Sequence, residues 1–196
     1  MYKKITLLTV TLSTFTTITP DATPWIEIKP SYFTFSNCLM SEIYDKGGFE
    51  VQASGSIPVY KRLDIYTSIG YRQSWGHALS TGEKTNLIVI PFDIGLKPVF
   101  NFSDHAYYFC AAGPRFFFFH QHNKSAYVNC IINDTGIGLF INSGFNVLLK
   151  DHFLFGLFAE YSYEPTNVSS TKQNVFSNGN VSIGGFAVGV NFGYAF

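Results

Sequence analysis

The C-terminal end of the chain alternates, residue by residue, between two kinds of side chain. One parity is large and apolar, and it consists of Phe186, Val188, Val190, Phe192, Tyr194 and Phe196. The residues between them are glycine, alanine or asparagine. A period of two is the pattern of a β-strand with two different faces, and it is incompatible with an amphipathic helix.

Composition makes this strand unusual. The chain has 196 residues, of which 18% are aromatic and only 13% are charged, about half the usual charged fraction. Thirteen bases balance thirteen acids, so no basic excess is available for nucleic acid. The uncharged stretches 135–149 and 173–196 are broken by glycine and asparagine, which argues against membrane-spanning helices. The apolar residues therefore belong to strands.

Seven further segments show the same alternation, although Phe140 and Phe158 fall on the wrong parity in theirs. These segments are 25–35, 49–57, 63–73, 86–98, 106–120, 137–149 and 153–164. With residues 185–196 they predict eight strands.

The connections between these strands are alternately long and short. The long ones are 36–47, 74–85, 121–134 and 165–180, and the short ones are 58–62, 100–105 and 149–152. Such a pattern places four long loops at one end and three tight turns with both termini at the other. It predicts an all-β fold, an eight-stranded antiparallel up-and-down transmembrane β-barrel, whose closure leaves no unpaired edge in lipid.

The orientation of the faces follows from the cost of charge in lipid. An arginine or lysine on the lipid side of a barrel costs about 2–4 kcal/mol at the bilayer midplane, so the charged parity must point inward. The predicted lumen network contains Glu27, Lys29, Glu50, Asp64, Arg72, Asp93, Lys97, Arg115 and Glu160. Four bases and five acids predict a closed polar lumen, because a selective pore would carry one sign of charge.

Aromatic residues near both ends of the strands predict two interfacial girdles. We assign Tyr71, Trp75, Tyr161 and Tyr163 to the long-loop end, and Tyr107, Tyr108, Tyr194 and Phe196 to the short-turn end.

At the N-terminus, Lys3 and Lys4 precede an uncharged stretch, the order of a secretory signal peptide. We expect a signal peptide over residues 1–22 and the barrel domain over residues 23–196.

Over residues 25–196 the chain resembles the small outer-membrane barrels typified by OmpA, OmpX and OmpW. The ending with Phe192, Tyr194 and Phe196 resembles the signal that the barrel assembly machinery reads. The resemblance implies an outer membrane of the bacterial type, periplasmic termini and extracellular long loops. Lipid and that machinery are the expected partners, with room for an extracellular ligand, and no catalytic residue or cofactor is implied.

Three cysteines leave at least one unpaired. Cys38 and Cys130 lie in long loops at the same end, so a disulfide between them, an intermolecular bridge and reduced thiols are all open, with Cys110 expected to face lipid. His77, His120 and His122 lack ligand-like spacing to carboxylates or thiolates, so no metal site is predicted.

Three functions fit this sequence. A structural or surface-interaction role is favoured by the balanced lumen. A narrow channel for small or apolar solutes, as in OmpW-like barrels, rests on Phe117, Phe119, Phe140 and Phe158 facing inward. A lipid-modifying enzyme would need His77 with Ser74 or Ser80, or His120 with Ser125, and no orienting carboxylate is evident. A soluble lipocalin would place the apolar face inside and the charged face outside. This chain has too few charged residues to make such an outer surface soluble.

Overall fold

The computed structural model describes residues 24–44, 47–77, 82–103, 105–124, 129–150, 152–166 and 181–196. The predicted signal peptide over residues 1–22 lies outside the described residues. No helix among the described ranges is long and apolar enough to cross a membrane.

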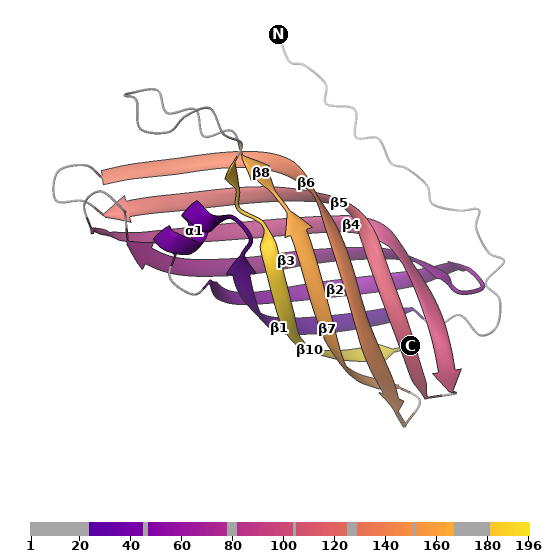
Figure 1. Ribbon diagram of the computed structural model, residues 1–196. Coiled ribbons are helices and arrows are strands. Elements are labelled where there is room, and N and C mark those ends of the chain that lie inside the picture. The colour runs from indigo at the N-terminus through magenta and orange to yellow at the C-terminus, as the bar shows by residue number, and fades with distance from the viewer. Residues whose placement is uncertain are drawn as a thin grey trace, which may run out of the picture.

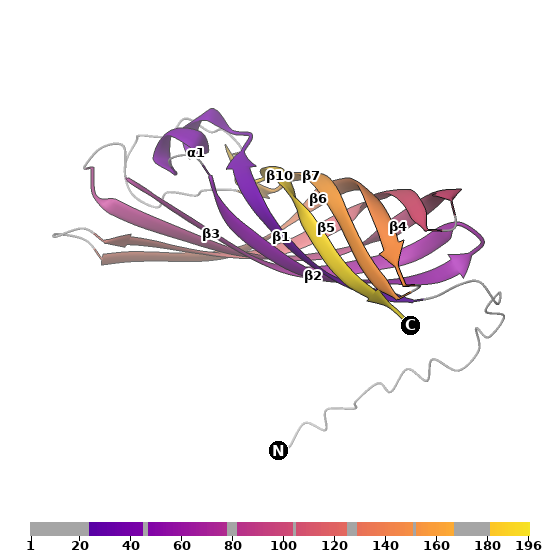
Figure 2. The ribbon, with the colours of Figure 1, turned by 90° about the horizontal axis from the view of Figure 1, so that it is seen from below.

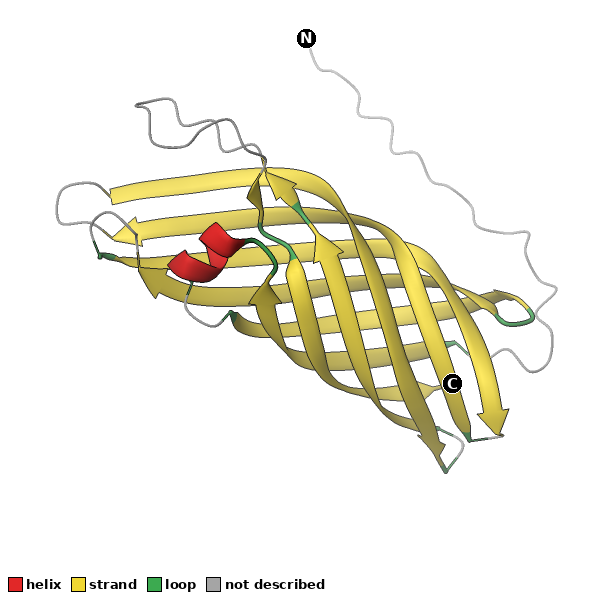
Figure 3. Cartoon of the chain, viewed as in Figure 1, coloured by secondary structure: helices red, strands yellow, loops and turns green. Residues whose placement is uncertain are grey.

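Eight strands close into one antiparallel barrel, which confirms the predicted fold (Figure 1 and Figure 3). The strands are β1 (Trp25–Phe35), β2 (Gly48–Tyr60), β3 (Leu63–His77), β4 (Lys84–Ser103), β5 (Ala106–Lys124), β6 (Asn129–Leu149), β7 (Phe153–Tyr163) and β10 (Gly185–Ala195). Each pairs with its neighbour in the chain, and β10 pairs with β1 to close the ring. A ribbon of β8 (Pro165–Thr166) and β9 (Val181–Ser182) continues beyond β7 and β10.

The barrel is staggered. From Phe33 in β1, the paired residues through β2, β3, β4 and β5 lead to Ile132 in β6, whereas those through β10 and β7 lead to Asn142, ten residues further along the same strand. Closing a sheet with such a stagger tilts its strands against the barrel axis, as Figure 2 shows from below.

The strands differ in length by almost a factor of two. β1, β7 and β10 have 11 residues each, whereas β4, β5 and β6 have 20, 19 and 21. At about 3.3 Å per residue and a tilt of roughly 40°, the shortest strands cross about 28 Å, close to the apolar band of a membrane barrel.

The longer strands rise past that level at the end of the barrel that carries the short helix (Figure 1). We call this part the extended wall, and it comprises residues 74–77, 84–88, 119–124 and 129–135. The predicted loops 74–85 and 121–134 are therefore largely strand, and only 78–81 and 125–128 between them lie outside the described residues. The polar composition of these segments resembles that of loops, although their backbones continue the barrel pairing.

The predicted loop over residues 36–47 contains the helix α1 (Cys38–Ile43), drawn red in Figure 3. Asn37 caps it by accepting from the backbone N–H groups of Leu39 and Met40 at 3.0 and 3.4 Å. Behind the helix, Gly47 has φ +82°, and a Cβ there would lie 1.8 Å from the Phe33 carbonyl oxygen. Only glycine fits this return into β2.

The two faces of the wall have the predicted orientation. Large apolar side chains are exposed on the outside, including Ile28, Ile69, Ile94, Phe116, Ile141, Leu157, Val188 and Phe192. Charged and small polar side chains are buried inside. One girdle assignment is wrong: Tyr107 points into the lumen and is buried, because it has the same parity in β5 as Phe109 and Arg115.

Candidate functional site

The interior of the barrel is occupied by ionisable side chains, and we treat it as the candidate site. Four bases and six acids of the described chain project into it, and none is more than 4% exposed. All nine residues predicted for the lumen lie there, and Glu164 joins them. They form two groups, one around arginines and one around lysines.

Arg115 is the centre of the arginine network. Its Nε and Nη2 donate to the two carboxylate oxygens of Asp93 at 2.6 and 2.7 Å, a bidentate pair. Nη2 also donates to Glu160, and Nη1 donates to Glu164 at 3.1 Å. One guanidinium from β5 therefore ties β4 to β7 and to the segment after β7 across the lumen.

Arg72 is the second base of this network. Its Nε donates to Glu50 at 2.8 Å, and its Nη1 and Nη2 donate to Glu164 at 3.1 and 3.2 Å. The Phe33 ring lies 3.6 Å from the guanidinium carbon, a cation–π contact. Glu164 thus bridges Arg72 and Arg115.

Glu164 is the lumen residue that sequence reasoning left out of the network. It stands just after β7 and before β8, at the point where alternation in the sequence ends. Glu164 has the same parity as Glu160, and this shared parity is the sequence signal that could have placed it in the lumen.

Neutral polar groups complete the hydrogen bonding of the acids. Gln52 donates to both Glu50 and Glu160, at 2.8 and 3.0 Å. Asn142 donates to Glu160 at 2.9 Å, and Ser68 donates to Asp93 at 2.6 Å. Buried carboxylates are tolerated when their lone pairs are satisfied in this way.

The lysine network lies nearer the end with the short turns. Lys29 and Lys97 contact the two oxygens of Glu27 at 3.3 and 3.2 Å. Asn146 also donates to Glu27, at 3.3 Å, and to the Tyr107 hydroxyl at 2.9 Å. Asp64 is the register partner of Lys97, and its Oδ2 has no hydrogen-bond partner among the described groups.

Aromatic rings surround both ammonium groups of this network. The Phe109 ring centre lies 5.3 Å from Lys29 Nζ and 4.6 Å from Lys97 Nζ, and the Tyr66 ring is within 6 Å of both. Tyr66 also accepts a hydrogen bond from Lys29 at 3.2 Å. Cation–π contacts of this kind compensate part of the lost hydration of the ammonium groups.

Apolar clusters occupy the lumen on either side of the charges. At the helix end, Met40 and Tyr44, from α1 and its C-terminal cap, pack with Leu87, Phe117 and Phe119. At the other end a second cluster contains Val99, Tyr107, Phe109, Leu154 and Phe158. Phe140 packs with Tyr66 and Ala111 between them. The phenylalanines on unexpected parity, Phe140 and Phe158, therefore fill the interior.

The residues of the predicted assembly signal lie on the outside. Phe192, Tyr194 and Phe196 are exposed, and Tyr194 packs edge-to-face against Phe196 and Phe153. Phe192 and Tyr194 belong to β10, which pairs with β1. Nothing in this geometry tests recognition by the assembly machinery, which stays a prediction.

The disulfide between Cys38 and Cys130, one of three alternatives that the sequence leaves open, stays a hypothesis. Cys38 is a free, exposed thiol, and the Cys130 side chain lies outside the described part of the chain. Cys110 is also a free thiol and is half-buried on the outward parity of β5.

Of the serine–histidine pairs considered for catalysis, the one that the structure describes fully does not come together. Ser74 is buried on the inner face of β3, whereas His77 is exposed on the outer face. Ser80 and Ser125 lie outside the described residues. Among the described residues no three His, Cys, Asp or Glu side chains are grouped so that they could hold a metal ion.

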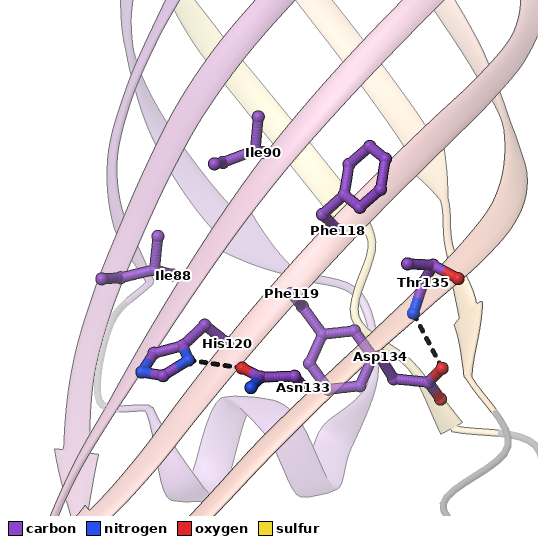
Figure 4. A pocket seen from close by; sticks show the side chains of 8 residues that line it. All are labelled: Ile88, Ile90, Phe118, Phe119, His120, Asn133, Asp134 and Thr135. Carbon is purple, nitrogen blue, oxygen red and sulfur yellow. Dashed lines mark hydrogen bonds between the residues drawn. The ribbon is translucent and has the colours of Figure 1, made fainter. Parts of the chain in front are cut away.

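An open groove of about 390 Å³ lies on the outside of the barrel at the base of the extended wall (Figure 4). It is lined by Ile88, Ile90, Phe118, Phe119, His120, Asn133, Asp134 and Thr135. The His120 ring donates through Nδ1 to Asn133 Oδ1, as the dashed line in Figure 4 marks.

Solved structures of small outer-membrane barrels are similar to this fold. The outer membrane protein OprG from Pseudomonas aeruginosa is 12% identical, with a TM-score of 0.67 over 89% of this chain and 96% of that one. The chain has the fold of the small outer-membrane β-barrels. Neisserial surface protein A is likewise 12% identical, with a TM-score of 0.56 over 88% of this chain and 97% of that one.

A third similar structure is Ail, the attachment invasion locus protein of Yersinia pestis, solved with the heparin analogue sucrose octasulfate. It is 12% identical, with a TM-score of 0.52 over 89% of this chain and 99% of that one. No protein-family model matches the chain, and no curated protein matches its sequence. The likeness therefore carries the fold and no residue-level function.

Proposed function

We propose that the protein is an outer-membrane barrel with a sealed lumen, whose role is structural or surface-interacting. In this proposal the termini face the periplasm, and the extended wall, α1 and the long loops face the exterior. The observation that carries it is the burial of all ten acidic and basic side chains found in the lumen. A water-filled path past these groups would leave them accessible to solvent.

The charge pattern also supports a seal. Each arginine contacts at least two carboxylates, and the two lysines share Glu27. Permeant ions need binding that is weak enough to release them, and a selective pore usually carries rings of one charge. The acids and bases neutralise one another across the lumen, which favours holding the strands together over conducting ions.

The alternative is a narrow channel for small or apolar solutes. Phe117, Phe119, Phe140 and Phe158 face inward as that hypothesis requires. They are all buried and packed within apolar clusters, which favours a filling role.

Single-channel recording in planar bilayers tests the proposal. We expect no sustained steps from the wild-type barrel. As a positive control, Phe117→Ala with Phe140→Ala removes two buried rings from the lumen and should produce measurable leak. The matched control is Phe116→Ala with Phe186→Ala, which removes two outward rings and should stay silent. Sustained wild-type conductance would reject the sealed lumen in favour of the channel.

Membrane location has its own test. A barrel embedded in the outer membrane should fractionate with it and shift in gel mobility only after boiling in SDS, because closed barrels resist unfolding by this detergent. Recovery of the folded chain in aqueous buffer would reject the location. Phe196→Ala should slow assembly in cells if the terminal strand is read by the assembly machinery, while refolding in detergent should change little.

The proposal assigns no reaction and no cofactor. If the protein binds an extracellular partner, the extended wall and α1 are the described parts that would contact it. A lipid-modifying activity would contradict it and would appear as turnover of outer-membrane lipid that His120→Ala abolishes.

A further inference from the structure

The arginine network holds more acids than bases. Its two bases are Arg72 and Arg115, and its four acids are Glu50, Asp93, Glu160 and Glu164. The lysine network is balanced, since its two lysines lie with two acids, Glu27 and Asp64. If every carboxyl group were ionised, the arginine network would carry an excess of two negative charges while fully buried. Buried charge without a partner is so costly that the group takes up a proton instead.

The hydrogen bonds show which acids the arginines neutralise. Both oxygens of Asp93 accept from Arg115, through Nε and Nη2, at 2.6 and 2.7 Å. Both oxygens of Glu164 accept from Arg72, through Nη1 and Nη2, at 3.1 and 3.2 Å. Each arginine therefore has one bidentate carboxylate partner, the strongest arrangement for this pair of groups. The two remaining acids are the excess.

Glu50 and Glu160 are these remaining acids, and an arginine contacts each of them through a single oxygen. They come from β2 and β7 and meet at Gln52, whose Nε2 donates to Oε1 of both at 2.8 and 3.0 Å. None of these three side chains is more than 3% exposed. Two carboxyl groups that share such a place repel each other when both are ionised, which favours a proton on one of them.

Two amide oxygens beside the pair provide acceptors for such a proton. Gln52 Oε1 and Asn142 Oδ1 are buried and receive no hydrogen bond from the described groups. Asn142 Nδ2 donates at 2.9 Å to Glu160 Oε2, the oxygen that Arg115 does not contact. A half-turn of this amide exchanges its nitrogen and its oxygen, and the oxygen then accepts from a Glu160 O–H. An ionised carboxylate has no hydrogen to donate to either amide oxygen.

The other titratable groups near the pair do not neutralise it. They are Lys29 from β1, Tyr66 from β3 and Lys97 from β4. Both lysines contact Glu27, and the Tyr66 hydroxyl accepts from Lys29. Beside the pair, β6 and β10 place only neutral side chains in the described lumen. No additional base is therefore available to the excess acids.

We propose that Glu50 and Glu160 share one proton in the folded barrel at neutral pH, which makes the pair a proton-binding site inside the lumen. The inference goes beyond the proposed function but rests on its sealed lumen, because water beside the pair would stabilise both charges. It also makes the attachment of β2 to β7 across the lumen sensitive to alkaline pH.

The direction of this sensitivity follows from proton linkage. A glutamate in the unfolded chain is ionised above roughly pH 4.3, so the folded barrel binds one proton more than the unfolded chain at neutral pH. Stability therefore falls as the pH rises, by about tenfold in the folding equilibrium constant for each pH unit. The decline ends where the folded pair itself releases the proton.

Infrared difference spectroscopy of the barrel in lipid vesicles detects the proton, because a carboxylic acid and a carboxylate absorb at different frequencies. We expect an acid band at neutral pH that disappears in alkaline buffer. Glu160→Gln with Glu50→Gln removes the pair and should remove the band. Asp64→Asn is the matched control, because Asp64 is a buried lumen acid whose Oδ2 also lacks a described partner, and it should leave the band in place.

Urea titration from neutral to alkaline pH gives the second readout. The wild type and Asp64→Asn should lose stability as the pH rises. Glu160→Gln with Glu50→Gln leaves two acids for two arginines, so this variant should fold without that loss. A variant that lacked only a structural contact would be less stable at every pH and would keep the wild-type slope.

Three outcomes would overturn the shared proton. They are the absence of an acid band from the wild type at neutral pH, a band that Asp64→Asn removes, and a stability that follows sodium concentration instead of pH. The last would indicate a metal cation beside the pair. If the double variant does not fold, the wild-type band and its response to Asp64→Asn still decide. A failure of the sealed lumen looks different, because the wild-type barrel would then also conduct in planar bilayers.

Discussion

The strands on the two sides of the barrel alternate in the same way but differ in length. On the short side, β1, β7 and β10 have 11 residues each and cross little more than the apolar band of a membrane. On the long side, β4, β5 and β6 have about twice as many residues and continue into the extended wall. The short side has about the strand length needed to cross a membrane. The long side has additional strand residues that form the extended wall.

The surfaces of the two sides differ accordingly. The outer face of the short side stays apolar from Phe153 to Tyr163 and along β10. The outer face of the long side turns polar above Ile90 and carries histidines. The interior is not divided in this way, because the charge networks join residues of both sides.

The largest expected effect concerns that shared interior. Arg115→Ala removes a buried base that contacts Asp93, Glu160 and Glu164, and leaves their charges uncompensated. We expect a loss of about 3–5 kcal/mol in the free energy of unfolding, measured by urea titration of the barrel in lipid vesicles. The control Lys84→Ala, on the exposed end of β4, should change it by about 0.5 kcal/mol or less. Equal losses would mean that the buried network does not join the two sides.

The next effect compares the outer faces directly. Leu157→Arg on the short side places a charge at mid-membrane depth and should cost about 2–4 kcal/mol, whereas Ile88→Arg on the long side should cost about 0–1 kcal/mol. Both residues are aliphatic and lie on the outer wall, so their side-chain chemistry is matched. The same urea titration measures both. A similar cost at the two positions would place the extended wall inside the hydrocarbon layer.

A smaller effect tests the corrected position of Tyr107. Tyr107→Phe removes the hydroxyl that accepts from Asn146 at 2.9 Å in the lumen. We expect a loss of about 1 kcal/mol in unfolding free energy. The outward neighbour Tyr108 donates to or accepts from Ser143 at an exposed position, and Tyr108→Phe should have less effect. A reversed order would indicate that Tyr107 faces lipid after all.

The smallest expected effect is local to α1. Asn37→Ala removes the cap of the helix, worth about 1 kcal/mol, and should speed amide hydrogen exchange at Leu39 and Met40 by roughly fivefold. Asn37→Ser, which retains a capping oxygen, is the control. Exchange that is unchanged in Asn37→Ala would mean that packing of Met40 and Tyr44 alone holds the helix over the lumen.

Much of the fold could be predicted from alternation because lipid imposes a strict rule on each face. A charge on the outside is costly at every position in the apolar band, so the inward parity of Asp93, Lys97 and Glu160 is readable from the chain alone. The rule weakens where water replaces lipid. His77, His120 and His122 are therefore typical of a loop by composition, yet they belong to strands that continue into the extended wall.

The interior contents were harder to predict for a related reason. Polar and apolar residues are both acceptable inside a filled lumen, so residue type does not reveal the face on which Tyr107 or Phe158 lies. Only the parity that they share with Arg115 in β5 and Glu160 in β7 does. Partners across the lumen, such as Arg115 with Glu164, depend on the stagger of the barrel, which no local pattern encodes. The groove on the outer wall likewise arises from three strands whose register only the closed ring defines.

The seam between β1 and β10 has a consequence for how the molecule is made. Trp25 pairs with Ala195, so nearly the whole polypeptide must be synthesised before the ring can be completed. Contacts this distant in sequence slow folding, because the entropy of a very large loop is lost before the pairing is gained. Until the last strand arrives, the first strand keeps an open edge, and protection of that edge against aggregation has to come from outside the chain.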